Sequence, residues 1–254
     1  MSTTSNAANA ALLIPPAASP HAHSGASVSR VMLRVMLALT PATFYGFWLF
    51  GWPAVHLFWI TVAGCVLSEL FCQRLMGRRG SLADGSAILT GWLLAISLPP
   101  WAPAWIGFLG GAIAIVIGKQ VFGGLGQNLF NPAMVARVAL LVSFPVVMTQ
   151  WAQPVPLFSP NAPGFVEGLR ITLEGIPIPD AVASASLLGH AKTELSRGLN
   201  LSQALGAQQS LFDWAGWRPG SLGESGAFLL LAGEIESTRL NSSHEFVSRM
   251  PSSA

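Results

Sequence analysis

The sequence predicts an all-α, polytopic membrane protein, built as a helical bundle that includes broken or half helices. Of the 254 residues, 52% are hydrophobic and only 9% are charged, whereas soluble domains carry roughly 25% charged residues. The mean hydropathy is +0.54. Several apolar runs also approach the roughly 20 residues that a helix needs to cross a bilayer. The chain is therefore expected to be surrounded by membrane lipid.

Charge and cysteine usage limit the partners of the chain. The net charge is +2, and no basic run alternates with aromatic residues as a nucleic-acid-binding surface requires, so nucleic acid is excluded as a partner. Cys65 and Cys72 fall seven residues apart on one predicted helix, about 10 Å along its axis, which prevents a disulfide. They are either apolar filling or iron–sulfur ligands shared with another protein of a complex.

Apolar runs divide the chain into a tail and a membrane domain. Residues 1–30 are rich in Ala, Ser, Asn and Pro and are expected to form a flexible cytoplasmic tail. Residues 31–151 are predicted to form a membrane domain of five helical spans, at residues 31–50, 54–72, 86–98, 104–121 and 132–151. The third of these runs has only thirteen residues, which is too short for a complete crossing and predicts a broken or half helix.

A basic loop sets the orientation of these spans. Arg74, Arg78 and Arg79 lie close together between the second and third runs, and the positive-inside rule places such a loop in the cytoplasm. The N-terminus is then cytoplasmic, and five crossings put residues 152–224 in the periplasm. We therefore expect a multi-pass protein with a long periplasmic loop.

That predicted loop contains a segment that resembles a flavin-attachment sequence. Flavin transferases join the phosphate of FMN to a hydroxyl side chain in the pattern Asp-x-x-Ser/Thr-Gly/Ser-Ala-Thr. Ser186 stands where the pattern has Thr, and Ala183 replaces a hydroxyl residue. Ser186 is therefore the candidate for covalent FMN through a phosphoester, and the other cofactor-binding residues would be Asp180, Ser184 and Ala185. The alternative is an ordinary polar loop or a helix cap.

A glycine-rich run, residues 118–126, precedes the fifth predicted span. A phosphate-binding Walker loop is excluded because Lys119 precedes the glycines and both neighbouring segments are predicted membrane helices. Irregular backbone is tolerated in a membrane only where it is buried in protein or lines a cavity. The candidates for an ion or cofactor passage are Asp84, Lys119, Gly123, Gly124, Asn128 and Arg137. The alternatives are close helix packing for the glycines, and interfacial anchoring for Glu69, Asp84 and Arg137.

Three segments together resemble one protein family. Residues 84–91, residues 118–133 and the flavin-like segment look like the RnfD component of the Rnf-type electron transport complex, which is similar to the NqrB component of the sodium-translocating NADH:quinone oxidoreductase. The resemblance implies a bacterial inner-membrane protein of roughly ten spans in two inverted halves, of which this chain would hold the first. It also implies a multisubunit complex that moves electrons between NADH and ferredoxin with ion translocation. FMN on Ser186, a flavin transferase as partner and room for a second flavin are further implications.

The C-terminal part departs from this pattern. Residues 225–233 look like the start of a sixth span, but the apolar run stops there. Residues 234–254 are polar and Ser-rich and are expected to be a non-native tail on a truncated chain. A second functional class stays open, because broken helices and membrane glycines are also typical of a channel or secondary transporter for a small solute or ion.

Overall fold

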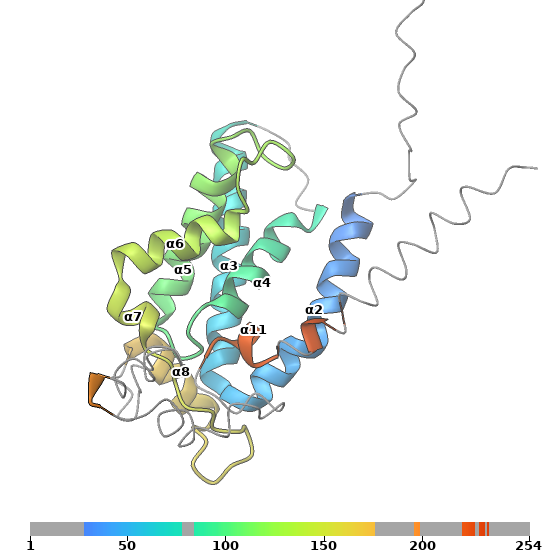
Figure 1. The fold of residues 1–254 in the computed structure, drawn as a ribbon. Coiled ribbons are helices and arrows are strands. Elements are labelled where there is room, and N and C mark those ends of the chain that lie inside the picture. Colours follow the sequence, from blue (N-terminus) through green and yellow to red (C-terminus); the bar gives the residue numbers. More distant parts are fainter. Residues whose placement is uncertain are drawn as a thin grey trace, which may run out of the picture.

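The computed structural model describes residues 28–77, 84–175, 196–198, 220–226, 229–231 and 233 (Figure 1). Its elements are α2 (Val28–Phe50), α3 (Trp52–Leu75), α4 (Ser86–Ser97), α5 (Ala104–Ile115), the π-helical turn η2 (Val116–Gln120), α6 (Pro132–Ser143), α7 (Pro145–Thr149), α8 (Phe165–Glu174) and α11 (Leu222–Ser225). No strand occurs among the described residues. The predicted all-α class is confirmed for this part of the chain.

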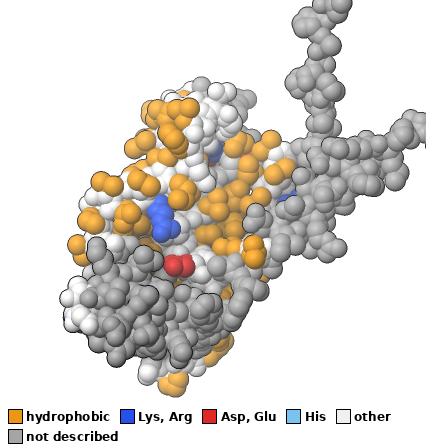
Figure 2. All heavy atoms as spheres, in the orientation of Figure 1, with side chains coloured by type: hydrophobic (Ala, Val, Ile, Leu, Met, Phe, Trp, Pro, Cys, Tyr) orange, Lys and Arg blue, Asp and Glu red, His pale blue; other side chains and the backbone are white. Residues whose placement is uncertain are grey.

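Two helices, α2 and α3, are long and apolar enough to cross a membrane by length and composition. Three shorter apolar helices accompany them: α4, α5 together with η2, and α6. Helix α4 has twelve residues, the short length expected for residues 86–98. Large hydrophobic side chains on α2 and α3 are more than half exposed, among them Leu37, Phe44, Trp59 and Phe71, and Figure 2 shows hydrophobic side chains across the described part of one face. Soluble proteins rarely expose large apolar patches, so this surface fits lipid. The number of crossings stays a prediction.

Helix α3 forms the centre of the bundle and packs against both α4 and α5. Glycines make this contact close. A Cβ atom added at Gly91 would lie 2.8 Å from the Cα atom of Val62, and one added at Gly111 would lie 2.8 Å from the backbone nitrogen of Cys65. Because backbone faces backbone at these points, the helices approach only where one partner lacks a side chain. The apolar core beside them includes Leu57, Leu94, Ile106 and Leu140.

One end of the bundle gathers the last turns of α3 and η2 with the first turns of α4 and α6. The Lys119 side chain contacts Glu69 of α3 and Ser86 of α4. Gly118 lies against Pro132, the first residue of α6. We call this region the Lys119 end.

The opposite end gathers the end of α2, the start of α3, the α4–α5 connection and α8. The indole N–H of Trp101 donates a hydrogen bond to the carbonyl of Phe50 at 2.9 Å. Gly168 of α8 lies against the first turn of α3, and Gly175, which follows α8, lies beside Pro103. We call this region the Trp101 end. Helices α3, α4, α5 and α6 thus run between the two ends in alternating directions (Figure 1).

The predicted fifth span, residues 132–151, is broken in the structure. Helix α6 ends at Ser143 and α7 begins at Pro145. Phe144 between them has φ −132° and ψ 57°, outside the helical region. A residue before proline is disfavoured in the α conformation, and Pro145 has no N–H to continue the hydrogen-bond ladder. The run has the composition of a span but does not form one continuous helix.

Helix α8 lies within residues 152–224, the predicted periplasmic loop, where the apolar runs indicate no helix. It ends at Gly175, whose φ of 64° and ψ of 42° give the left-handed conformation that glycine adopts at helix ends. One face buries Gly168 and Thr172, and the Thr172 hydroxyl donates to the Gly168 carbonyl at 2.9 Å. A ten-residue helix is marginal in isolation, so its packing against α3 stabilises it.

The segment that follows α11 runs along α2. Gly226 lies beside Ala42, and Gly233 lies beside Ala38, so the described residues of this segment follow α2 toward its N-terminus. The predicted start of a sixth span falls in this segment and stays a prediction. The predicted tails, except for residues 28–30 at the start of α2, lie outside the described residues.

The close contact of α3 and α5 gives a first testable prediction. Gly111→Ala should destabilise the chain by roughly 1–3 kcal/mol, because the new methyl group meets backbone atoms that cannot turn away. The measurement is thermal unfolding of the detergent-solubilised chain, followed by circular dichroism. Gly164→Ala is the control, since nothing lies within 4 Å of a Cβ atom at that position. Equal melting temperatures for the two variants would contradict the backbone contact.

Candidate functional site: a buried ion pair at the Lys119 end

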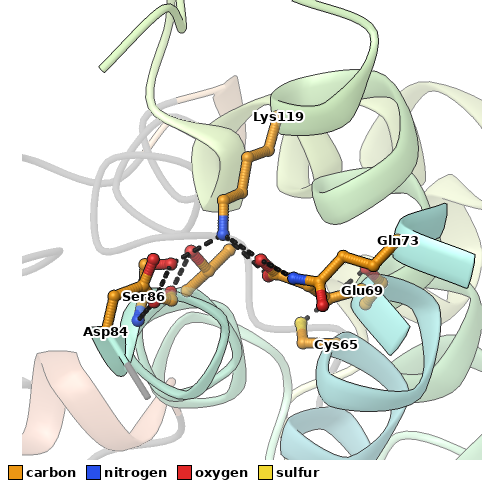
Figure 3. Close-up of polar contacts among 8 residues, drawn as sticks. Cys65, Glu69, Gln73, Asp84, Ser86 and Lys119 are labelled. Carbon is orange, nitrogen blue, oxygen red and sulfur yellow. Dashed lines mark hydrogen bonds and ion pairs between the residues drawn. The ribbon is translucent and has the colours of Figure 1, made fainter. Parts of the chain in front are cut away.

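A π-helical turn carries Lys119 into the interior. The N–H of Val121 donates to the carbonyl of Val116 at 3.0 Å, five positions back instead of the four of an α-helix. Such wide turns are rare and occur frequently at functional sites. In Figure 3 the Lys119 side chain points between α3 and α4.

The ammonium of Lys119 meets the carboxylate of Glu69. Lys119 Nζ lies 2.8 Å from Glu69 Oε1 and 2.7 Å from Oε2, and the two side chains are only 2% and 4% exposed. One turn further along α3, Gln73 Nε2 donates to Glu69 Oε1 at 3.3 Å. The carboxylate therefore faces hydrogen-bond donors rather than apolar side chains.

The same ammonium reaches the first residue of α4. Lys119 Nζ donates to Ser86 Oγ at 2.6 Å. Ser86 donates in turn to Asp84 Oδ1, from its hydroxyl at 2.7 Å and from its backbone N–H at 2.8 Å. A continuous series of polar contacts thus joins Glu69, Lys119, Ser86 and Asp84 (Figure 3). The carboxylate of Glu69 contacts the ammonium directly, and that of Asp84 acts on it through Ser86.

The energetic weight of this pair differs from that of a surface pair. Charged groups inside a membrane protein are expensive unless they are paired, and removing one partner of a buried pair leaves an uncompensated charge. Arg170 and Glu174 on α8 also form an ion pair, with Nε and Oε2 3.0 Å apart, but their side chains are 62% and 54% exposed. Solvent screens such a pair, which is worth little.

The glycines after η2 close the turn that holds Lys119. Gly123 and Gly124 have φ values of 109° and 105°, which side-chain-bearing residues rarely adopt. The N–H of Gly124 donates to the carbonyl of Lys119 at 3.1 Å, and that of Gly123 donates to the carbonyl of Gln120 at 3.0 Å. Both predicted passage glycines therefore hold the backbone around Lys119 in this structure. Their part in an ion or cofactor passage stays a prediction.

The other two predicted passage residues, Asn128 and Arg137, make no hydrogen bond or ion pair with Glu69 or Lys119 within the described ranges. The buried amide oxygen of Asn128 has no hydrogen-bond partner among the described residues. Arg137 lies half-buried on α6, and no ion pair of Arg137 occurs within the described ranges. The structure thus brings Asp84 and Lys119 together with Glu69 and leaves Arg137 outside the network.

Comparison with known proteins assigns the chain to a family. Residues 16–236 match the model of the NQR2, RnfD, RnfE family. The chain belongs to this family. The predicted resemblance to RnfD is confirmed at the level of this family.

Three curated relatives carry the same name, which describes the D subunit of an ion-translocating oxidoreductase complex. The protein of Halorhodospira halophila (strain DSM 244 / SL1) is 50% identical over 221 residues, which cover 86% of this chain and 62% of the relative. The protein of Stutzerimonas stutzeri is 52% identical over 211 residues, 82% of this chain and 60% of the relative. The protein of Escherichia coli (strain K12 / DH10B) is 36% identical over 217 residues, which cover 80% of this chain and 61% of the relative. This chain spans about three fifths of the length of these relatives.

The predicted flavin-attachment residues lie outside the described part of the chain. These are Asp180, Ser184, Ala185 and Ser186. The described backbone leads toward them as far as Gly175 at the Trp101 end. Within the described residues, no group of three or more His, Cys, Asp and Glu side chains could hold a metal ion.

Three members of the network, Glu69, Ser86 and Gln73, are not among the predicted site residues. Ser86 could be found from the sequence Asp84-Gly85-Ser86 before an apolar run, since Asp and Ser cap helix starts. Gln73 follows Glu69 by four positions, the spacing of neighbours on one helix face. Cys65, by contrast, is fully buried, and its sulfur lies 3.7 Å from the Gly111 carbonyl, which favours its interpretation as apolar filling.

The buried pair gives a second prediction. Glu69→Gln and Lys119→Met should each lower the free energy of unfolding by roughly 3–5 kcal/mol, because each leaves one buried charge without its partner. The double variant should recover much of this loss, since neither charge remains. Chemical unfolding of all variants in detergent gives the coupling energy of the cycle.

The exposed pair on α8 supplies the control for this cycle. Arg170→Ala should cost less than about 1 kcal/mol. Additive effects of the two substitutions at Glu69 and Lys119, or single effects as small as that of Arg170→Ala, would show that the buried pair contributes no coupling.

Proposed function

We propose that this chain is a membrane component of an ion-translocating electron transport complex that works between NADH and ferredoxin. The observation that carries the proposal is the family match over residues 16–236, supported by relatives whose names describe one subunit of an ion-translocating oxidoreductase complex. The partners are the other subunits of that complex and membrane lipid. The location is a bacterial inner membrane, which the chain crosses several times.

In this proposal electrons pass through FMN joined by a phosphoester to Ser186. The chemistry of the residue fits, because a serine hydroxyl is small and can carry a phosphate ester. FMN supplies one-electron and two-electron redox chemistry, and the protein supplies its position and surroundings. A flavin transferase would act on the segment that contains Asp180, Ser184 and Ala185. The family resemblance leaves room for a second flavin.

The positions of the arginines at the ends of the bundle favour one orientation of the chain in the membrane. Arg74 lies in the last turn of α3, and Arg30 and Arg34 lie in the first turns of α2, whose Met36 is near Gly85. These three arginines therefore gather at the Lys119 end, and two more, at positions 78 and 79, follow α3 closely in the sequence. The positive-inside rule favours the cytoplasm for this end. The flavin segment follows Gly175 at the Trp101 end, which would then face the periplasm.

The buried network at the Lys119 end is proposed to serve ion translocation. Ionisable groups inside a membrane protein commonly mark ion pathways. Asp84 and Lys119 would contribute through the network. Glu69 joins them because it binds the ammonium of Lys119. The residues that would line or shape the neighbouring passage are Gly123, Gly124, Asn128 and Arg137.

A channel or secondary transporter for a small solute or ion is the second candidate. The observation in its favour is the combination of a buried ion pair with the interrupted helices α6 and α7. Flavin fluorescence that stays on the denatured polypeptide selects electron transfer. Solute flux into vesicles without bound flavin selects the transporter.

The proposed orientation is tested by labelling of introduced cysteines. A cysteine at Ser81 should react with a membrane-impermeant reagent only from the cytoplasmic side, and one at Asn161 only from the periplasmic side. Background labelling should be low because Cys65 and Cys72 are buried. Reaction of both introduced cysteines from the same side would rule out the proposed orientation.

The flavin assignment is tested by peptide mass mapping after co-expression with a flavin transferase. Ser186→Ala should lose covalent FMN completely, and Ser186→Thr should keep it, because the attacking oxygen survives. Asp180→Ala should reduce the labelled fraction by disturbing recognition. An FMN adduct on Ser184 or Thr193, or one that persists in Ser186→Ala, would refute the assignment.

A further inference from the structure

Helix α8 has three sides of different character. Because successive residues of an α-helix are rotated by about 100°, its residues fall into separate sectors around the axis. Gly168 and Thr172 face the bundle and are buried. The next sector, which we call the apolar flank, consists of Val166, Leu169 and Leu173. The charged side chains lie beyond it, roughly opposite the buried side, and are Glu167, Arg170 and Glu174.

The apolar flank is open to the surroundings of the chain. Val166 is 76% and Leu173 is 60% exposed, and Leu169 is half-buried. A helix whose outer surface met only water would carry polar residues over all of that surface. The outer surface of α8 is instead apolar on one side and charged on the other. This division is typical of a helix that lies at the boundary between an apolar and an aqueous phase.

The position of α8 in the bundle matches such a boundary (Figure 1). Gly168 lies against Trp52 and Pro53, the first two residues of α3. Phe165, the first residue of α8, contacts the ring of His56, with the ring centroids 4.8 Å apart. His56 follows Trp52 by four residues, which is about 6 Å along the helix axis. Interfacial helices bury their apolar side about 5–10 Å into the boundary of headgroups and acyl chains. If α3 begins at the membrane surface, α8 lies at that depth.

Exposed tryptophans lie toward the same end of the bundle. Trp48 stands near the end of α2, Trp59 two turns into α3, and Trp105 at the second position of α5. Their side chains are 38%, 62% and 45% exposed, respectively, and tryptophan is enriched where membrane meets water. Helix α8 packs against α3 and α5, so its apolar flank adjoins helices whose own exposed rings would meet lipid. The surrounding surface therefore favours lipid as the occupant of the flank.

We propose that α8 is an interfacial helix, whose apolar flank contacts phospholipid at the membrane surface while its charged side faces water. The charged side carries two carboxylates and one guanidinium, so it gives no attraction to anionic headgroups, and contact with zwitterionic phospholipid is expected. The inference rests on the proposed passage of the chain through a membrane. Because α8 is followed by Gly175, eleven positions before Ser186 in the sequence, the chain would leave for the proposed flavin residue from the membrane surface.

The test places a fluorescent probe on single introduced cysteines of the full chain, held without other subunits in nanodiscs of phosphatidylcholine. Leu173→Cys and Glu174→Cys form a matched pair, because they are neighbours in sequence but lie on the apolar flank and on the charged side. Cys65 and Cys72 are buried and should take up little label. Spin-labelled lipid should quench the probe at position 173 strongly and iodide should quench it weakly, whereas the order should reverse at position 174.

Further variants separate this inference from the proposed function. Val166→Cys and Glu167→Cys repeat the comparison near the other end of α8, should Leu173→Cys disturb the fold. Leu67→Cys is the reference for lipid contact, because Leu67 is a 54% exposed residue of α3.

Lipid quenching at position 67 with iodide access at position 173 would overturn the interfacial helix alone. Protection of position 173 from both quenchers would also overturn it, because protein would then cover the flank. Absence of lipid quenching at position 67 would overturn the membrane crossing of α3 and this inference together. None of these measurements uses flavin, so the FMN assignment is tested separately.

Discussion

The contact between the carboxylate of Glu69 and the ammonium of Lys119 stays buried only if α3, α4 and η2 pack closely around it. This close packing depends on contacts elsewhere in the bundle. Gly91 and Gly111 bring the backbones of α4 and α5 against α3, which lets residues 50 positions apart in sequence join at 2.7 Å. The start of α6 lies against Gly118. The apolar contacts bring the charged groups together, and the cost of an unpaired buried charge penalises any looser arrangement of the same helices.

The bundle also separates the two proposed sites. The polar network lies at one end, and the segment that leads to Ser186 leaves from the other. The 24 residues of α3 span about 36 Å at the rise of an α-helix. If electrons and ions are handled at these two ends, their coupling has to pass through the packed helices between them, or through partner proteins that contact both. Physical coupling over such a distance requires an element with two discrete arrangements that both sites bias.

Parts of this arrangement follow from local sequence and parts do not. The apolar runs and their Gly and Pro boundaries predict α2, α3, α4 and α5 within a few residues, and Asn131-Pro132 marks the start of α6. The break at Phe144 follows from Pro145 but is masked by the apolar residues around it. Helix α8 depends on its contact with α3, which no local pattern contains.

The candidate site divides in the same way. Asp84 and Lys119 could be singled out as charged residues in an apolar chain. The hydrogen-bond connection between them through Ser86, and the pairing of Lys119 with Glu69, depend on the packing of three helices. The flavin assignment rests on pattern and family, because those residues lie outside the described structure.

The π-helical turn η2 limits how the length of this segment can change. The hydrogen bonds of a π-helix join residues five positions apart, whereas those of an α-helix join residues four positions apart. The turn η2 therefore holds one more residue than the same turn of a regular α-helix. Loss of one residue between Val116 and Lys119 would remove this extra residue and restore the hydrogen bonds of an α-helix. The wide turn that carries Lys119 to Glu69 and places Gly118 against Pro132 would then be lost. Substitutions at the exposed Val116 and Ile117 are compatible with the ion pair, whereas a change in the number of residues is not, so the length of η2 is constrained more tightly than the identities of these two residues.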